Sequence, residues 1–254
     1  MVSGKNTFIY ILYFLFIISA GNNINAQSKR ISDHNTIAWC NFYATVKLNE
    51  KWGLHSDIQC RRVDGISKPQ QMLYRFGINY QPIPELLLRV GGAFVQTFPY
   101  GDYPLNAYGK KTDEYRTFEL ITISQKLRSF DLSHRFMLEQ KWNGKFKAAT
   151  SQKPDSWPLT NRARYMFRIQ KPLNLKKNIY AAAYNELFVS FGKNVGENIF
   201  DQNRLTLMIG KKISKILRME AGFLSQTQQL SREVNGINVI QYNKGLILNS
   251  YFTF

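Results

Sequence analysis

The sequence predicts an all-β protein that forms a single antiparallel transmembrane β-barrel after a cleaved signal peptide. One long apolar run is confined to the N-terminus, and apolar and polar residues alternate along the rest of the chain. The alternating segments are about twice as long as the strands of a soluble sandwich, as a tilted strand that crosses a bilayer requires. We expect residues 1–26 to be the signal peptide and residues 27–254 to be the barrel domain.

The composition excludes several other classes of protein. The 254 residues include 34 Lys and Arg against 17 Asp and Glu, which gives a net charge of +17. The slightly negative mean hydropathy argues against a bundle of membrane-spanning helices, because each such helix needs about 20 consecutive apolar residues. A hydrophobic content of 44% is too high for a disordered chain, and two cysteines cannot form a disulfide scaffold.

The N-terminus predicts export. Lys5 precedes an uncharged apolar core from Phe8 to Ala20, which is too short to span a bilayer as a helix, and Ala26 suits the cleavage site. The basic excess therefore belongs to the exported protein. For an exported protein we expect an anionic membrane surface or anionic solutes as partners, and no nucleic acid.

The first two segments after the leader, residues 38–48 and 52–61, predict a hairpin. Residues that face each other across antiparallel strands share a face, so pairing the two apolar faces fixes the register. The predicted opposing pairs are Cys40 and Cys60, Phe42 and Ile58, Tyr43 and Asp57, Thr45 and His55, Val46 and Leu54, and Leu48 and Trp52. The two cysteines could form a disulfide in an oxidising envelope or remain free thiols.

Nine further segments continue the alternation, which makes eleven candidates: 72–80, 86–94, 114–127, 130–142, 161–171, 177–190, 200–210, 216–228 and 239–254. Short turns alternate with longer polar loops at 62–70, 98–113, 143–160, 191–199 and 229–238, as in bacterial outer-membrane barrels. Since single-chain bacterial barrels have an even number of strands, we expect twelve strands, with ten as the alternative. Leu120 and Ile121, adjacent apolar residues, suggest a bulge in segment 114–127.

Aromatic residues near the segment ends predict the two girdles of a membrane barrel. The residues assigned to them are Trp39, Trp52, Tyr80, Phe94, Trp142, Tyr165 and Phe252. The last segment, which ends in Phe254, is typical of the closing strand of a barrel inserted by the outer-membrane barrel assembly machinery. We therefore expect the outer membrane of a Gram-negative bacterium as the location, with lipid and lipopolysaccharide around the barrel.

Four motifs, in their order along the chain, resemble those of the domain of unknown function 2490 family. They are His134–Lys141, Arg162–Tyr165, Asn185–Phe188 and Phe200–Leu205. The resemblance covers essentially the whole chain after the leader and implies an outer-membrane β-barrel. It carries no established activity or catalytic residue.

The polar faces of the segments predict a cationic lumen, in which basic residues outnumber acidic ones. The basic residues are Lys47, Arg61, Arg75, Arg89, Arg135, Lys141, Arg162, Arg164, Arg168, Arg204 and Arg218, and the acidic ones are Asp57, Glu139, Glu186 and Glu220. The candidate luminal charge network is Arg75, Arg135, Glu139, Arg164, Arg168, Glu186, Arg204 and Glu220.

We expect Arg–Glu ladders to fill most of this lumen, because small barrels are usually filled by side chains. The protein would then have a structural or small-solute-handling role. The alternative is a small anion-preferring pore or a ligand-binding barrel, in which Arg135, Arg164, Arg168 and Arg204 bind an anionic solute.

A lipid-modifying outer-membrane hydrolase is the competing class. Of the three histidines, His34 precedes the first segment and His134 falls on the lipid side. Only His55 lies on the luminal face, beside Asp57 and opposite Thr45. Thr45, His55 and Asp57 would then be the nominal nucleophile, base and orienting residue of a hydrolase. Such a combination arises readily on polar faces, so we expect no catalytic residues. We also expect no cofactor and no metal site, since the sequence lacks a metal-ligand cluster and a phosphate-binding loop.

Overall fold

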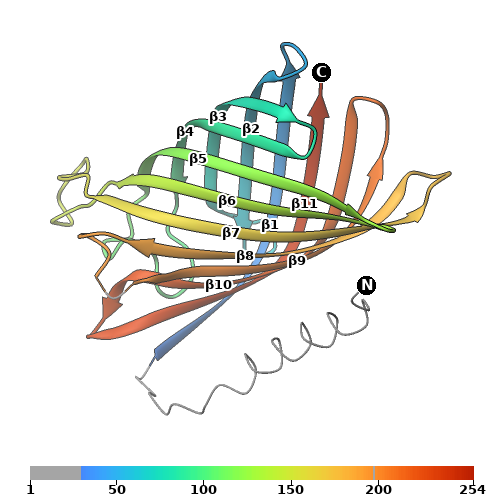
Figure 1. The fold of residues 1–254 in the computed structure, drawn as a ribbon. Coiled ribbons are helices and arrows are strands. Elements are labelled where there is room, and N and C mark those ends of the chain that lie inside the picture. The colour runs from blue at the N-terminus through green and yellow to red at the C-terminus, as the bar shows by residue number, and fades with distance from the viewer. Residues whose placement is uncertain (1–29, 197) are drawn as a thin grey trace, which may run out of the picture. The chain divides into compact units, whose positions relative to one another are not determined.

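The computed structural model describes residues 30–196 and 198–254, and these residues form a closed β-barrel of eleven strands (Figure 1). The predicted signal peptide lies outside the described residues. The strands are β1 (Arg30–Lys47), β2 (Trp52–Val63), β3 (Lys68–Ile83), β4 (Leu86–Thr97), β5 (Thr112–Leu127), β6 (Phe130–Asn143), β7 (Leu159–Asn174), β8 (Ile179–Phe191), β9 (Phe200–Lys212), β10 (Leu217–Val234) and β11 (Ile237–Thr253). Within the described residues, no helix has the length and apolar character needed to cross a membrane.

Strands that follow one another in the sequence pair in antiparallel fashion all the way from β1 to β11. The register predicted for the first hairpin is confirmed from Cys40 opposite Cys60 through Val46 opposite Leu54. Both cysteines are free thiols. The hydrophobic pattern was therefore sufficient to fix which residues face each other in this hairpin.

The barrel is closed by a parallel pair of strands, β1 and β11. The Phe254 N–H donates to the Thr45 carbonyl and the Lys47 N–H donates to the Phe254 carbonyl, each at 2.9 Å. This is the hydrogen-bond pattern of a parallel bridge. The side chains of Asn41 and Asn249 also meet, with a sequence separation of 208. The pair formed by Asp33 and Gln241 has the same separation, so the two strands run in the same direction along the seam.

The strand count of twelve, and its alternative of ten, was wrong. An even number is needed only when every neighbouring pair is antiparallel, and the parallel seam lets eleven strands close. The suggested bulge was also wrong, because β5 pairs in regular register with β4 and β6. Leu120 points into the lumen there, and Ile121 is exposed on the outside.

Two of the predicted long loops are much shorter in the structure, because the neighbouring strands extend into them. The predicted loop 62–70 reduces to a turn of residues 64–67, and the predicted loop 229–238 reduces to Asn235 and Gly236. Both of these residues have positive φ angles, 52° and 71°, which suits a two-residue turn whose twist matches that of the strands. The end of β10 from Gln226 to Glu233 is mostly polar, and for that reason it resembled a loop in the sequence.

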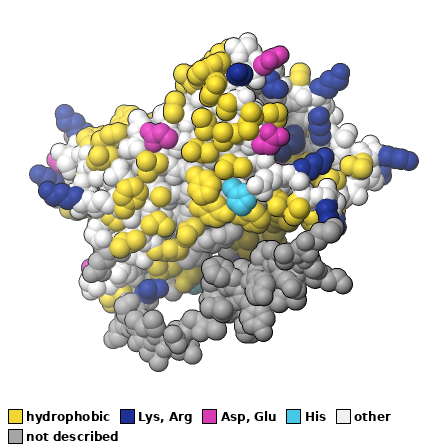
Figure 2. All heavy atoms as spheres, viewed as in Figure 1, with side chains coloured by type: hydrophobic (Ala, Val, Ile, Leu, Met, Phe, Trp, Pro, Cys, Tyr) yellow, Lys and Arg dark blue, Asp and Glu magenta, His cyan; other side chains and the backbone are white. Residues whose placement is uncertain are grey.

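The outside of the barrel is apolar and its ends are basic. Figure 2 shows hydrophobic side chains along the strands and Lys and Arg side chains toward the two ends. Outward-facing residues such as Phe42, Phe76, Val90, Leu207 and Leu246 are between 48% and 68% exposed. A monomeric soluble protein rarely exposes so many large apolar side chains together.

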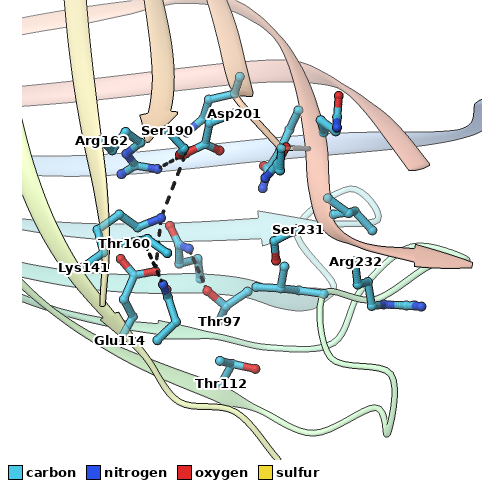
Figure 3. A pocket seen from close by; sticks show the side chains of 18 of the residues that line it. Thr97, Thr112, Glu114, Lys141, Thr160, Arg162, Ser190, Asp201, Ser231 and Arg232 are labelled. Carbon is cyan, nitrogen blue, oxygen red and sulfur yellow. Dashed lines mark hydrogen bonds and ion pairs between the residues drawn. The ribbon is translucent and has the colours of Figure 1, made fainter. Parts of the chain in front are cut away.

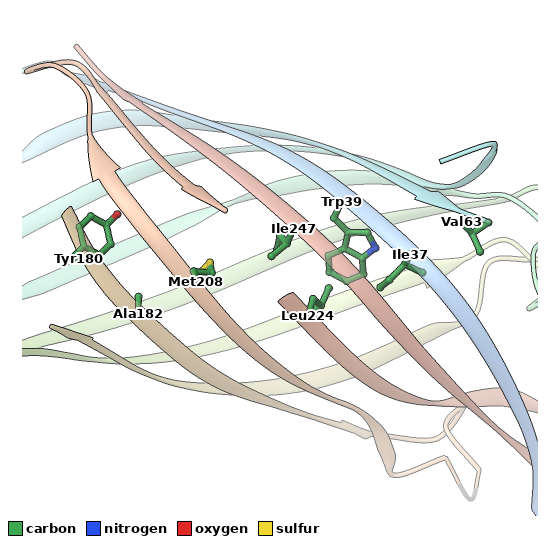
Figure 4. Packing of buried hydrophobic residues seen from close by; sticks show 8 residues of the cluster. All are labelled: Ile37, Trp39, Val63, Tyr180, Ala182, Met208, Leu224 and Ile247. Carbon is green, nitrogen blue, oxygen red and sulfur yellow. The ribbon is translucent and has the colours of Figure 1, made fainter. Parts of the chain in front are cut away.

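The inside combines buried polar residues with a smaller apolar cluster. The cluster comprises Ile37, Trp39, Val63, Tyr180, Ala182, Met208, Leu224 and Ile247 (Figure 4). Trp39 is only 3% exposed, so its assignment to an aromatic girdle was wrong. It lies directly opposite Arg61 in the β1–β2 register, on the luminal face.

Candidate functional site in the charged lumen

The predicted luminal charge network separates into three groups of ion pairs. In the central group, Arg164 donates to Glu139 at 2.9 Å and to Glu186 at 2.7 Å. Arg135 donates to Glu186 at 2.8 Å, and Arg204 lies 3.9 Å from the same carboxylate. Glu139 and Glu186 are 0% and 3% exposed, and their burial is offset by several charge-assisted hydrogen bonds.

The other predicted network residues form two separate groups. Arg168 pairs with Glu220 at 2.6 Å, and the hydroxyls of Tyr180 and Tyr251 donate to the same carboxylate at 2.7 and 3.0 Å. Arg75 pairs at 3.0 Å with Asp57, which the network prediction did not include. The eight predicted residues are therefore all luminal, but the ion pairs do not connect them into one network.

A further chain of charges, whose members are absent from the predicted network, lies toward the rim with the longer loops (Figure 3). It joins the central group through the pair of Arg162 with Glu139. Asp201 accepts from Arg162 at 2.7 Å and lies 4.0 Å from Lys141. Lys141 in turn lies 3.8 Å from Glu114, which also accepts from Arg116. The alternation in segment 114–127 could have identified these residues. If it is extended from the apolar centre of the segment toward its start, Glu114 and Arg116 fall on the luminal face.

Two cavities occupy the lumen and share one wall. One cavity opens at the rim that carries the longer loops; it has a volume of about 380 Å³ and is here called the vestibule. The other cavity lies toward the opposite rim, where β11 ends, and has a volume of about 640 Å³. Five residues line both cavities, and we call them the arginine partition: Gln59, Arg61, Arg75, Arg164 and Arg204. The partition places four guanidinium groups between the two openings of the barrel.

The four arginines of the partition differ in their partners. Arg75 and Arg164 each contact a carboxylate within 3.0 Å. Among the described residues, Arg61 has no carboxylate within 4.0 Å, and Arg204 has only the long contact to Glu186. Both lie over the indole of Trp39, with their guanidinium carbons 3.9 and 4.9 Å from the ring centroid.

The loop between β4 and β5, residues 98–111, folds against the vestibule. The Tyr100 hydroxyl donates to Gln241 at 2.9 Å, and Arg232 donates to the Pro104 carbonyl at 2.9 Å. Burial raises the pKa of the Tyr100 hydroxyl, so this group remains a neutral donor. The loop thereby narrows the vestibule on one side.

The nominal hydrolase set is brought together at the C-terminal side of the partition. The Thr45 hydroxyl lies 3.1 Å from His55 Nδ1. The other ring nitrogen of His55 lies 3.7 Å from Asp57, which is longer than a hydrogen bond, and Asp57 is engaged by Arg75. His134, predicted on the lipid side, faces outward and contacts the Tyr165 hydroxyl at 2.9 Å.

The fold and its lumen define a class of protein: a single-chain, closed β-barrel with an apolar outside and an ion-paired interior. Residues 36–236 match the family described as "Protein of unknown function (DUF2490)", and the chain belongs to this family. The resemblance seen in the four sequence motifs is thereby confirmed. No curated protein matches the chain in sequence.

Proposed function

We propose that the protein is an outer-membrane β-barrel of a Gram-negative bacterium, exported by a signal peptide at residues 1–26. The observation that carries this proposal is the distribution of side chains, which is apolar outside and charged inside. An apolar surface of this kind is stable in lipid, and a closed barrel leaves no strand edge exposed there. In this setting the protein would contact lipid and lipopolysaccharide and be inserted by the barrel assembly machinery.

Within the membrane, the proposed role is structural or small-solute handling, with no catalytic activity. The support is the arginine partition, whose side chains stand between the vestibule and the opposite cavity. Ion pairs such as Arg164–Glu186 hold this wall in place. Solutes would enter the vestibule without crossing the barrel.

A small anion-preferring pore is the second candidate. It is favoured by the two cavities on either side of the partition and by the excess of arginine there. Its test is replacement of Arg135, Arg164, Arg168 and Arg204 by Gln. A pore would lose its anion preference in this variant, and unchanged selectivity would contradict the pore.

The location is tested by expressing the full chain in a Gram-negative host and separating the membranes. We expect the protein in the outer-membrane fraction, with a gel mobility that changes on heating, as a folded barrel shows. Recovery in the cytosol would overturn the proposal. Phospholipid hydrolysis by the purified protein that is lost in His55→Ala would overturn the non-catalytic role.

A further inference from the structure

We propose that Arg61 and Arg204 form a binding subsite for the oxyanion of a small solute at the inner end of the vestibule. The proposal rests on the solute-handling role proposed above and names the class of solute. The subsite comprises the two arginines and Trp39, which lies beneath both guanidinium groups.

The strand register fixes the geometry of this subsite. Trp39 and Arg61 face each other across the β1–β2 pair, and Arg204 reaches the same indole from β9. Trp39 is 3% exposed and each arginine is 8% exposed, so all three side chains are held in place by packing. Guanidinium groups stacked on an aromatic ring keep their N–H edges available for a ligand.

The hydrogen-bonding capacity of the two arginines is incompletely used. Arg61 donates to Gln59 and Gln71, and Arg204 donates to Gln202, and all three partners are neutral amides. The Nε atoms of both arginines are buried without a partner in the described part of the chain. Two buried cations on one ring are costly to desolvate, and an oxyanion bound between them would offset that cost.

The surroundings indicate what else the solute carries. Glutamine amides line the vestibule near the arginines, including Gln59, Gln70, Gln202 and Gln226. Amides both donate and accept, which suits a solute with several hydroxyl groups. A cavity of about 380 Å³ is in the range of small-molecule sites. The solute class is therefore a hydroxylated carboxylate or phosphate of about monosaccharide size.

Calorimetry on the full chain, purified from membranes in detergent at low salt, tests the proposal with glucuronate, inorganic phosphate and glucose as probes. We expect glucuronate and phosphate to bind and glucose to bind much more weakly. In the double variant Arg61→Gln and Arg204→Gln, binding of both anions should weaken by at least about tenfold, the effect of losing charged hydrogen bonds.

The matched control is Arg218→Gln, which removes a charge from the other cavity and should leave anion binding unchanged. Arg204→Lys keeps the charge but loses the forked donors, and it should also weaken binding. Each variant is first checked for heat-modifiable mobility, so that misfolding is recognised, and Arg204→Lys supplies the test if the double variant does not fold.

Three results would overturn the subsite. They are equal anion binding in the arginine variants and the wild type, glucose binding as tight as glucuronate binding, and no binding by the folded wild type. None of these results would affect the membrane location, which fractionation tests separately.

Discussion

Asn41 in β1 donates a hydrogen bond to Asn249 in β11 at 2.8 Å, and both side chains are buried in the lumen. The two strands run in the same direction, so this contact joins the first and last strands across a parallel seam. All the other strand pairs of the described barrel are antiparallel. The parallel seam explains how an odd number of strands closes.

The seam register predicts which engineered cysteines will cross-link. In a background with Cys40→Ser and Cys60→Ser, we expect Asn41→Cys and Asn249→Cys to form an intramolecular disulfide under mild oxidation, measured by mass mapping. The control pairs Asn41→Cys with Gln241→Cys, which lies eight positions before Asn249 in β11, roughly 26 Å away at about 3.3 Å per residue. Cross-linking of the control pair in place of the first would contradict the parallel register.

Gly245 should be required for closure. A Cβ atom at this position would lie 1.6 Å from the Ile37 carbonyl oxygen of the neighbouring strand, so Gly245→Ala has to push β1 and β11 apart. We expect this variant to lose its heat-modifiable form at a lower temperature than the wild type. Gly92→Ala is the control, because its Cβ would make only an ordinary 3.5 Å contact. Equal stability of the two variants would argue against a close seam.

The central ion pairs should make Glu186 important for stability. Glu186→Gln leaves Arg135 and Arg164 without a charge that both use, and breaking a buried pair in this way costs about 3 to 5 kcal/mol. The measurement is urea unfolding in detergent. Glu119→Gln is the matched control, since Glu119 is exposed on the outside of the barrel and its loss should have a small effect. Equal unfolding midpoints would contradict a stabilising network.

The sequence predicted an all-β protein with a single barrel, the register of the first hairpin and the luminal side of each network residue. Alternation carries this information because period two identifies two faces wherever one of them is buried. The alternation itself predicted eleven segments, as the structure has. The count of twelve was wrong because it assumed an even number of strands, whereas β11 pairs with β1 in parallel at the seam.

Alternation also explains why only part of the candidate site was predicted, since it shows which residues face the lumen but not which of them meet there. Arg164, Glu186 and Glu139 lie in strands with clear alternation, and the structure brings them together. The sequence could not show that Trp39 lies under two arginines, because an aromatic residue near a segment end also suits a girdle. The sequence also could not show which arginines pair with a carboxylate, because several of the partner residues lie in strands far apart in the sequence.

The stability of the loop between β6 and β7 should depend on pH, because the Asp155 carboxylate holds part of this loop. The backbone N–H of Lys147 donates to the Asp155 carboxylate at 2.9 Å, and this bond lowers the pKa of Asp155 from its ordinary value. Because the pKa of Asp155 is lower in the folded state than in the unfolded state, the hydrogen bond stabilises the loop above about pH 4. This stabilisation is lost as the pH falls through the pKa that Asp155 has in the folded state. We expect faster amide hydrogen exchange at Lys147 in acid, after correction for the intrinsic rate. Asp155→Asn should remove most of this pH dependence, and an unchanged profile would exclude Asp155 as its source.

The central claim, a lumen closed by the arginine partition, is tested most directly by the conductance of the wild-type protein in planar bilayers. Insertion is verified in the same preparation by heat-modifiable mobility. We predict no sustained single-channel current in potassium chloride, because the partition is held by buried ion pairs such as Arg75–Asp57 and Arg164–Glu186. A steady, anion-selective current through the wild-type protein would contradict the account.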